Sequence, residues 1–239
     1  MKITLPDESI KELPIGTTGL DVALSIGPGL AKSAVAVNID GVQKDLCDPI
    51  DRDCSLSIIT LDSEEGLEIM RHTVAAQVLA LAIKNIYPDA KLAIGPTIEN
   101  GFYYDFLTQK TISTEDLPKI ENEMRKIIKE KSMIKKSLHD KNNAIGYFEN
   151  RSEDYKIKII EESEQSDHFQ IYSNEDADFI DLCRGPHLPD LSHIGAFKLT
   201  KVSGAYWKGN SSNEMLTRIY GTAWRTKKEL DAKLTQIEE

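Results

Sequence analysis

Short runs in which hydrophobic and polar residues alternate fill the first 61 positions of the chain. Alternation of this kind between turn residues predicts β-strands, and we expect strands at 2–5, 8–13, 34–39, 42–46 and 55–60. Thr18 is suited to cap a short helix over 21–26 that stops at Gly27. Asp40-Gly41 predicts a tight hairpin turn between the third and fourth strands. Residues 1–61 should therefore form a small sheet with one helix, in which Cys47 and Cys54 are packing residues.

Two long helical patterns follow. Asp62 and Glu65 predict a capping box for a helix that ends before Pro88. This helix is hydrophobic on more than one face, which indicates a central position in its domain. His72 lies on it, where a histidine is more often a core residue than a ligand. A second helix is expected from Thr114 to about Leu138, with one face that is basic but diluted by glutamates. The basic residues are Lys119, Arg125, Lys126, Lys129, Lys131, Lys135 and Lys136.

The remaining pattern is mixed. Asn100-Gly101 predicts a hairpin whose second strand carries Tyr103 and Tyr104 on opposite faces. A short helix is expected at 144–150, and 155–160 fits either a helix or a strand. Further strands are expected at 169–172, 178–182, 196–202 and 214–220. A helical pattern from Lys227 runs to Glu239 without an end signal, so we expect the intact protein to continue. The predicted class is α+β, with a small sheet domain before a larger domain of antiparallel sheet and long helices.

Composition narrows the possible functions. The 239 residues carry a formal net charge of −10, which argues against a general nucleic-acid binder because such binding depends on Lys and Arg. Three widely spaced cysteines suit a reducing compartment better than a disulfide framework. The hydrophobic runs are shorter than the ~20 residues that span a bilayer, and the start shows no signal-peptide pattern. We therefore expect a cytoplasmic protein that does not enter a membrane.

The densest run of reactive side chains is 179–187, Phe-Ile-Asp-Leu-Cys-Arg-Gly-Pro-His. Its Gly-Pro pair breaks any helix, so the run should be a strand that enters a turn where Cys183 and His187 converge. Such a pair suits a metal, a polarised water or a thiolate. One Cys and one His cannot complete a tetrahedral metal site, so partners must come from elsewhere. The alternative is a half-buried Cys beside a turn His that only satisfies backbone groups.

Four segments together resemble the amino-terminal half of bacterial-type threonyl-tRNA synthetases, in the right order over essentially the whole chain. They are Met70-Arg-His-Thr73, 93–105, 179–187 and 202–209. The resemblance implies a β-grasp TGS domain at 1–61, an editing domain at 62–224 and the start of a linker helix at 225–239. It also implies that tRNA is the partner and that serine wrongly esterified to threonine tRNA is the editing substrate. A catalytic core beyond residue 239 would use ATP, Mg and Zn and would form a homodimer.

The same family usually pairs a helical H-x-x-x-H with the C-x-x-x-H turn. Here the helix half is incomplete: counted from His72 the second position is Ala76, and counted back from Pro88 the two positions are Thr73 and Gln77. We therefore predict no tightly held metal in this part of the chain. Hydrolysis needs only an oriented water and a base, and the resemblance gives each side chain a role. The predicted catalytic residues are His187, Cys183, Asp181 and Lys156, with His72 or Gln77, and the predicted substrate-binding residues are Tyr104, Thr73 and Arg184.

In these roles His187 is the base or orients the water, Asp181 holds the reacting ammonium and Lys156 polarises the ester or ribose. Cys183 shapes the pocket rather than attacks, Gln77 or His72 supplies an orienting hydrogen bond, and Tyr104 lines the entry. Two simpler interpretations stay open: Lys156 as a surface lysine and Asp181 as a turn cap. An alternative function also stays open, in which the chain is a tRNA-binding module with a degenerate editing site.

Overall fold

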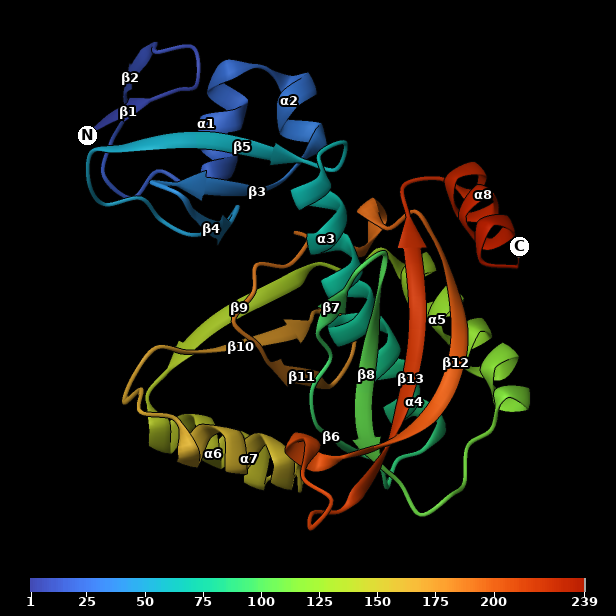
Figure 1. Ribbon diagram of the computed structural model, residues 1–239. Helices are drawn as coiled ribbons and strands as arrows, with labels where there is room; N and C mark the ends of the chain where they lie inside the picture. The colour runs from blue at the N-terminus through green and yellow to red at the C-terminus, as the bar shows by residue number, and fades with distance from the viewer. Residues whose placement is uncertain (239) are drawn as a thin grey trace.

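The computed structural model describes residues 1–238 (Figure 1). The first 60 residues form a five-stranded sheet of order β2-β1-β5-β3-β4, in which only β1 and β5 pair in parallel. The α+β class and the β-grasp arrangement of this domain are confirmed. The elements are β1 Lys2–Thr4, β2 Ile10–Glu12, α1 Gly19–Ile26, α2 Pro28–Ser33, β3 Ala34–Ile39, β4 Val42–Asp45 and β5 Cys54–Thr60.

Two details of the N-terminal domain differ from expectation. The Gly27-Pro28 pair ends α1 but also starts α2, because proline suits the first position of a helix. Cys54 is buried in the domain core as predicted. Cys47 is exposed, since it follows the buried Leu46 in the turn after β4, so its assignment as a packing residue was wrong.

A continuous helical segment over 64–86 leaves this domain and runs through the centre of the second one (Figure 1). It consists of α3 Glu64–Thr73, the π-helical turn η1 Val74–Leu79 and α4 Ala80–Ile86. The N-cap is Ser63, whose side chain accepts from the Gly66 amide, and not Asp62. By length and composition this is the one described segment that could cross a membrane, but 89% of its apolar window is buried inside the fold. That burial is typical of a core helix.

Two antiparallel sheets make up most of the second domain. One has the order β12-β13-β8-β6, with β7 also paired to β8, and the other has the order β11-β10-β9. The strands are β6 Lys91–Leu92, β7 Thr97–Ile98, β8 Gly101–Leu107, β9 Ile134–His139, β10 Phe169–Asn174, β11 Phe179–Leu182, β12 Ala196–Tyr206 and β13 Met215–Trp224. The helices are α5 Leu117–Glu130, α6 Lys141–Glu149, α7 Asp154–Glu162 and α8 Lys227–Glu238, with short 3-10 turns at Thr114–Asp116, Leu191–His193 and Trp207–Gly209. Residues 155–160 are thus helical.

The second long helix is shorter than the sequence predicts. It ends at Glu130, because Lys131 adopts a left-handed conformation (φ 57°) that a helix cannot continue through. The following residues form β9, which pairs with β10 over six positions. Lys135 and Lys136 therefore do not lie on the basic helix face, and the predicted basic surface over 119–136 is correspondingly reduced.

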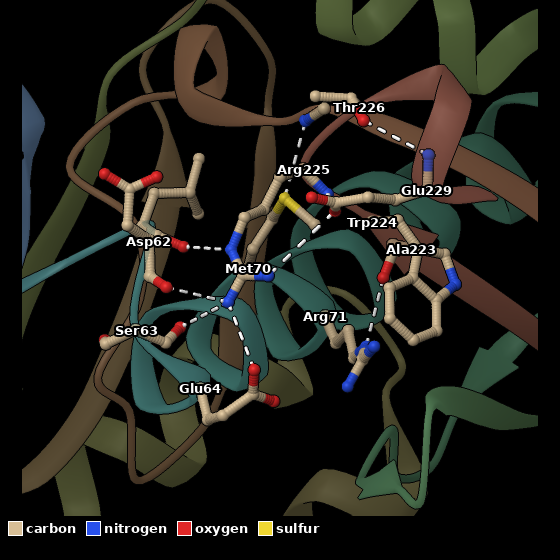
Figure 2. Close-up of polar contacts among 12 residues, drawn as sticks. Asp62, Ser63, Glu64, Met70, Arg71, Ala223, Trp224, Arg225, Thr226 and Glu229 are labelled. Carbon is tan, nitrogen blue, oxygen red and sulfur yellow. Dashed lines mark hydrogen bonds and ion pairs between the residues drawn. The ribbon is translucent and has the colours of Figure 1, made fainter. Parts of the chain in front are cut away.

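The two domains are packed together. Val35, Ala36 and Ile59 of the first domain belong to the same hydrophobic cluster as the central helix. Arg225, just before α8, donates from its guanidinium to the carbonyls of Leu61, Asp62 and Ser63 at the connection between the domains (Figure 2). The junction is therefore held both by hydrophobic burial and by a charged side chain that satisfies three backbone acceptors.

Candidate active site

A cavity of about 1170 Å³ lies in the second domain, beside the central helix. Its walls come from α3 and η1, the 94–96 loop, α7, β10 and the turn after β11. Several lining residues, among them Arg184, Glu164 and Gln165, are exposed, so the cavity reaches the protein surface. The long helix and the Cys183 turn, 111 positions apart in sequence, share this hollow.

His72 and Cys183 meet on the cavity wall. The Nε2 atom of His72 lies 2.7 Å from the Cys183 Sγ, and the Gly185 amide donates to the same sulfur. Burial raises the pKa of Cys183 to about 12, so the thiol carries its proton near neutral pH. Burial also lowers the pKa of His72, which a hydrogen bond to Gly95 only partly opposes. The pair is therefore a neutral imidazole that accepts from a neutral thiol.

His187 lies behind this pair. Its ring stacks on His72 with centroids 4.6 Å apart and planes within 6°, and it is 2% exposed. It does not line the cavity, and burial holds its pKa well below the ordinary value. The prediction that His187 holds the attacking water does not fit this position. The C-x-x-x-H spacing brings the imidazole near the thiol, but His187 stacks on His72 on the side away from the cavity.

Thr73 fixes the tautomer of His187. The Thr73 hydroxyl donates to the Ile69 carbonyl and accepts from the Leu188 amide, and it lies 3.0 Å from Nδ1 of His187. A hydroxyl has one proton and two lone pairs. The hydroxyl proton is donated to Ile69 and one lone pair accepts from Leu188, so the other lone pair accepts a hydrogen bond from Nδ1–H of His187. The Nε2 atom of His187 therefore carries no proton. Thr73 is fully buried and away from the cavity, so it supports His187 rather than binding substrate as predicted.

Lys156 and Asp181 form a buried ion pair on the same cavity. Lys156 Nζ lies 2.5 Å from Asp181 Oδ1, and both side chains are at most 3% exposed. The Tyr104 hydroxyl donates a hydrogen bond to Asp181 and accepts one from Lys156 Nζ. Burial raises the pKa of Asp181, and Lys156 opposes that effect. The interpretations of Lys156 as a surface lysine and of Asp181 as a turn cap are therefore wrong.

Tyr104 completes this group from behind. It is fully buried, it does not line the cavity, and burial raises its pKa well above the usual value. Its ring fills the space that a side chain at Gly95 would occupy. It therefore holds the ion pair and the 94–96 loop instead of lining the entry. Its neighbour Tyr103 lies on the opposite face of β8, against Arg218, as the alternation predicts.

Of the two predicted helix registers, the one counted from His72 is the one that faces the cavity. Ala76 lines the cavity together with His72, whereas Gln77 is fully buried and neither amide atom has a partner among the described residues. The count back from Pro88 gives the wrong positions because it crosses the π-helical turn over Val74–Leu79. The i→i+5 hydrogen bonds of such a turn accommodate one residue more than an α-helical turn does. Gln77 therefore does not supply the orienting hydrogen bond that this register predicts.

Three side chains could hold a metal ion. Ligand atoms of His72, Cys183 and His187 all lie within 4.8 Å of one another. Three protein donors and a water form the donor set of many catalytic zinc sites. Binding would have to displace the thiol proton, which the raised pKa of Cys183 opposes. The expectation of no tightly held metal stays a prediction.

Two contacts to the Cys183 turn could not be found from local sequence. Asp45, at the end of β4, accepts from the His187 amide at 2.9 Å and from the Tyr172 hydroxyl at 2.6 Å. The Tyr172 ring packs edge-on to His187, 4.5 Å between centroids. Asp45 stands 142 positions before His187, and no spacing within either segment signals the contact.

Comparisons with known proteins agree with the fold. Residues 1–60 match the TGS domain and residues 170–220 match the threonyl and alanyl tRNA synthetase second additional domain. The chain is 48% identical over 239 residues to the threonine-tRNA ligase of Acetivibrio thermocellus, covering 100% of this chain and 37% of that protein. It is 51% identical over 239 residues to the threonine-tRNA ligase of Paramagnetospirillum magneticum, covering 99% of this chain and 37% of that protein. The Francisella tularensis subsp. holarctica relative is 47% identical over 239 residues, with 100% and 37% covered.

The chain thus combines a TGS domain with the second additional domain that is named for threonyl and alanyl tRNA synthetases. Over essentially its whole length the chain is similar to threonine-tRNA ligases, and its two domains are consistent with the N-terminal region of those proteins. It spans a little over a third of the length of the curated relatives that it matches.

Proposed function

We propose that this chain hydrolyses the ester of serine wrongly attached to threonine tRNA. The observation that carries the proposal is the meeting of the His72–Cys183 pair and the Lys156–Asp181 pair on one cavity that reaches the surface. The match of residues 170–220 to the second additional domain of threonyl and alanyl tRNA synthetases supports it.

The physical need for such a site is clear. Serine lacks one methyl group of threonine, and a pocket gains only ~1–3 kcal/mol of discrimination from one such group. A synthesis site therefore cannot reject serine well enough alone. A second pocket that admits the smaller amino acid and lets water attack the ester removes the error.

Each cavity group has a role in this reaction. Asp181 is suited to bind the α-ammonium of the seryl group, and Lys156 to polarise the ester carbonyl or the adjacent ribose hydroxyl. His72, kept neutral by burial, is the imidazole on the cavity wall. Its Nε2 accepts from the Cys183 thiol, so a proton from the attacking water can reach it through that thiol, which passes its own proton to His72 and takes up the one from the water. His187 supports it by stacking. Cys183, as a neutral thiol, shapes the pocket instead of attacking. The exposed Arg184 at the rim is suited to meet a tRNA phosphate.

A binding module is the second candidate function. Ala76 occupies the cavity position where the family pattern has a second histidine, and this observation favours a site that grips the tRNA end but hydrolyses poorly. In either case we infer that the full-length protein attaches L-threonine to its tRNA with ATP, as a cytoplasmic homodimer. ATP, Mg and Zn would belong to a core that these residues do not include.

One assay separates the two functions. The chain is incubated with threonine tRNA that carries serine, and the loss of the ester is compared with its loss in buffer alone. We expect acceleration that His72→Asn abolishes, while the exposed-site variant Lys135→Met keeps the full rate. Binding of the tRNA with no acceleration over buffer would reject hydrolysis and leave the binding module.

A further inference from the structure

The carboxylate of Asp45 reaches out of the N-terminal domain into the second domain. It stands at the end of β4, which lies over β9 in Figure 1, and it is 5% exposed. Its two oxygens have different partners: Oδ1 accepts from the His187 amide, and Oδ2 accepts from the Tyr172 hydroxyl and from Lys136. The carboxylate thus satisfies three donors of the second domain.

Those donors surround the turn that carries Cys183 and His187. The turn packs directly against the Tyr172 hydroxyl at Gly185. A Cβ atom added to this glycine would lie 2.0 Å from that oxygen and 3.4 Å from Asp45 Oδ2. The Gly185 amide in turn donates to the Cys183 sulfur. A shift of the carboxylate would therefore move both the backbone of His187 and the surface against which the thiol turn rests.

A second carboxylate provides a contrast. Asp48 contacts Lys136 at 2.5 Å and accepts from the Asp45 amide, so it also joins the two domains. Within the described residues it makes no hydrogen bond to the turn or to Tyr172. Loss of Asp48 removes a docking contact, whereas loss of Asp45 removes a docking contact and the support of the turn.

We propose that Asp45 of the TGS domain is a positioning residue of the hydrolytic site, so that the N-terminal domain forms part of the editing machinery and is not only a separate tRNA-binding appendage. The inference rests on the proposed hydrolytic function. Asp45 acts through the His187 amide and Tyr172, and it does not touch the substrate. Its role is to fix the turn from which Cys183 meets His72.

The test uses Asp45→Asn in the full chain. A carboxamide has one oxygen, which the charged Lys136 draws to the Oδ2 side, so its NH2 group faces the His187 amide where that amide now has an acceptor. We expect kcat for seryl-tRNA hydrolysis to fall about tenfold, the cost of one hydrogen bond of ~1.4 kcal/mol, with KM within about twofold. Asp48→Asn should keep the kcat of the unaltered protein.

A rescue makes the test specific. Lys136→Met removes the charged donor that competes for the single oxygen of Asn at position 45, so this oxygen can turn to the His187 amide. The Tyr172 hydroxyl, which also lies 3.1 Å from Gln170 Oε1, can then donate to Gln170 and accept from the new NH2 group. The double variant should therefore hydrolyse faster than Asp45→Asn alone. A double variant no faster than the single, an unchanged kcat in Asp45→Asn, or an equal loss in Asp48→Asn would each overturn the proposal.

A second readout does not depend on hydrolysis. Hydrogen exchange of the His187 amide should be about tenfold faster in Asp45→Asn than in Asp48→Asn, since only the former loses its acceptor. Equal exchange in the two variants would overturn the positioning role. An inactive unaltered protein with the expected exchange difference would reject the proposed function and retain the positioning of the turn by Asp45.

Discussion

The buried ion pair of Lys156 and Asp181 gives the sharpest prediction about stability. At 2.5 Å and an effective dielectric constant of about 20, the gross attraction is about 7 kcal/mol. Most of this offsets the cost of taking two ions out of water, so the net value of the pair is small. Lys156→Met leaves the Asp181 carboxylate without a countercharge and with the Tyr104 hydroxyl as its side-chain donor, and we expect a loss of about 3–5 kcal/mol in unfolding free energy.

The double variant Lys156→Met with Asp181→Leu should recover much of that loss, because neither charge is then buried alone. Urea unfolding at pH 7 measures all three variants, and the exposed pair of Lys135 and Glu175 provides the control. Lys135→Met should cost less than about 1 kcal/mol. A Lys156→Met loss no larger than that control, or a double variant as unstable as Lys156→Met, would show that the unpaired Asp181 charge is not what destabilises the fold.

The pH dependence of Lys156→Met follows from the same geometry. Burial already raises the pKa of Asp181, and removal of the lysine raises it further. A group whose pKa is higher in the folded than in the unfolded state contributes more stability as the pH falls. The deficit of Lys156→Met should therefore shrink from pH 7 toward pH 5.

Three further predictions concern the cavity. Ala76→His should raise the rate of serine-ester hydrolysis because that position lines the cavity, whereas Gln77→His should not; the reverse order would restore the register counted from Pro88. Because burial lowers the pKa of His72, the hydrolysis rate should stay level from pH 8 to about 6.5 and fall only below it; a rate already halved at pH 7 would contradict a neutral imidazole. Dialysis against EDTA should leave the rate unchanged, since zinc would have to displace the proton of Cys183; activity lost on dialysis and restored by zinc would show a metal site.

Local patterns predicted much of the fold. Alternation and the Asp40-Gly41 turn gave the strands of the N-terminal domain, since each of those signals acts within a few residues. The hydrophobic faces of the central helix correctly indicated its buried position. The end of α5 was missed because Lys131 takes a left-handed conformation without the glycine that usually marks one, and pairing with β10 then decides that residues 134–139 form a strand.

The site was predicted less completely, for a physical reason. The 179–187 run identified Cys183 and Asp181 as neighbours of one cavity, and resemblance to a family added Lys156 and His72. The stacking that turns His187 inward and the contact from Asp45 join segments more than 100 positions apart. The stacking depends on how distant segments of the second domain pack, and the Asp45 contact depends on how the two domains dock; no local spacing encodes either.

The most direct test of the whole account compares two esters on the same tRNA. Under single-turnover conditions the chain should hydrolyse threonine tRNA that carries serine many times faster than the same tRNA that carries threonine. The cavity must admit the smaller side chain and exclude the extra methyl group. Equal rates for the two esters, or no acceleration of either over buffer, would contradict it.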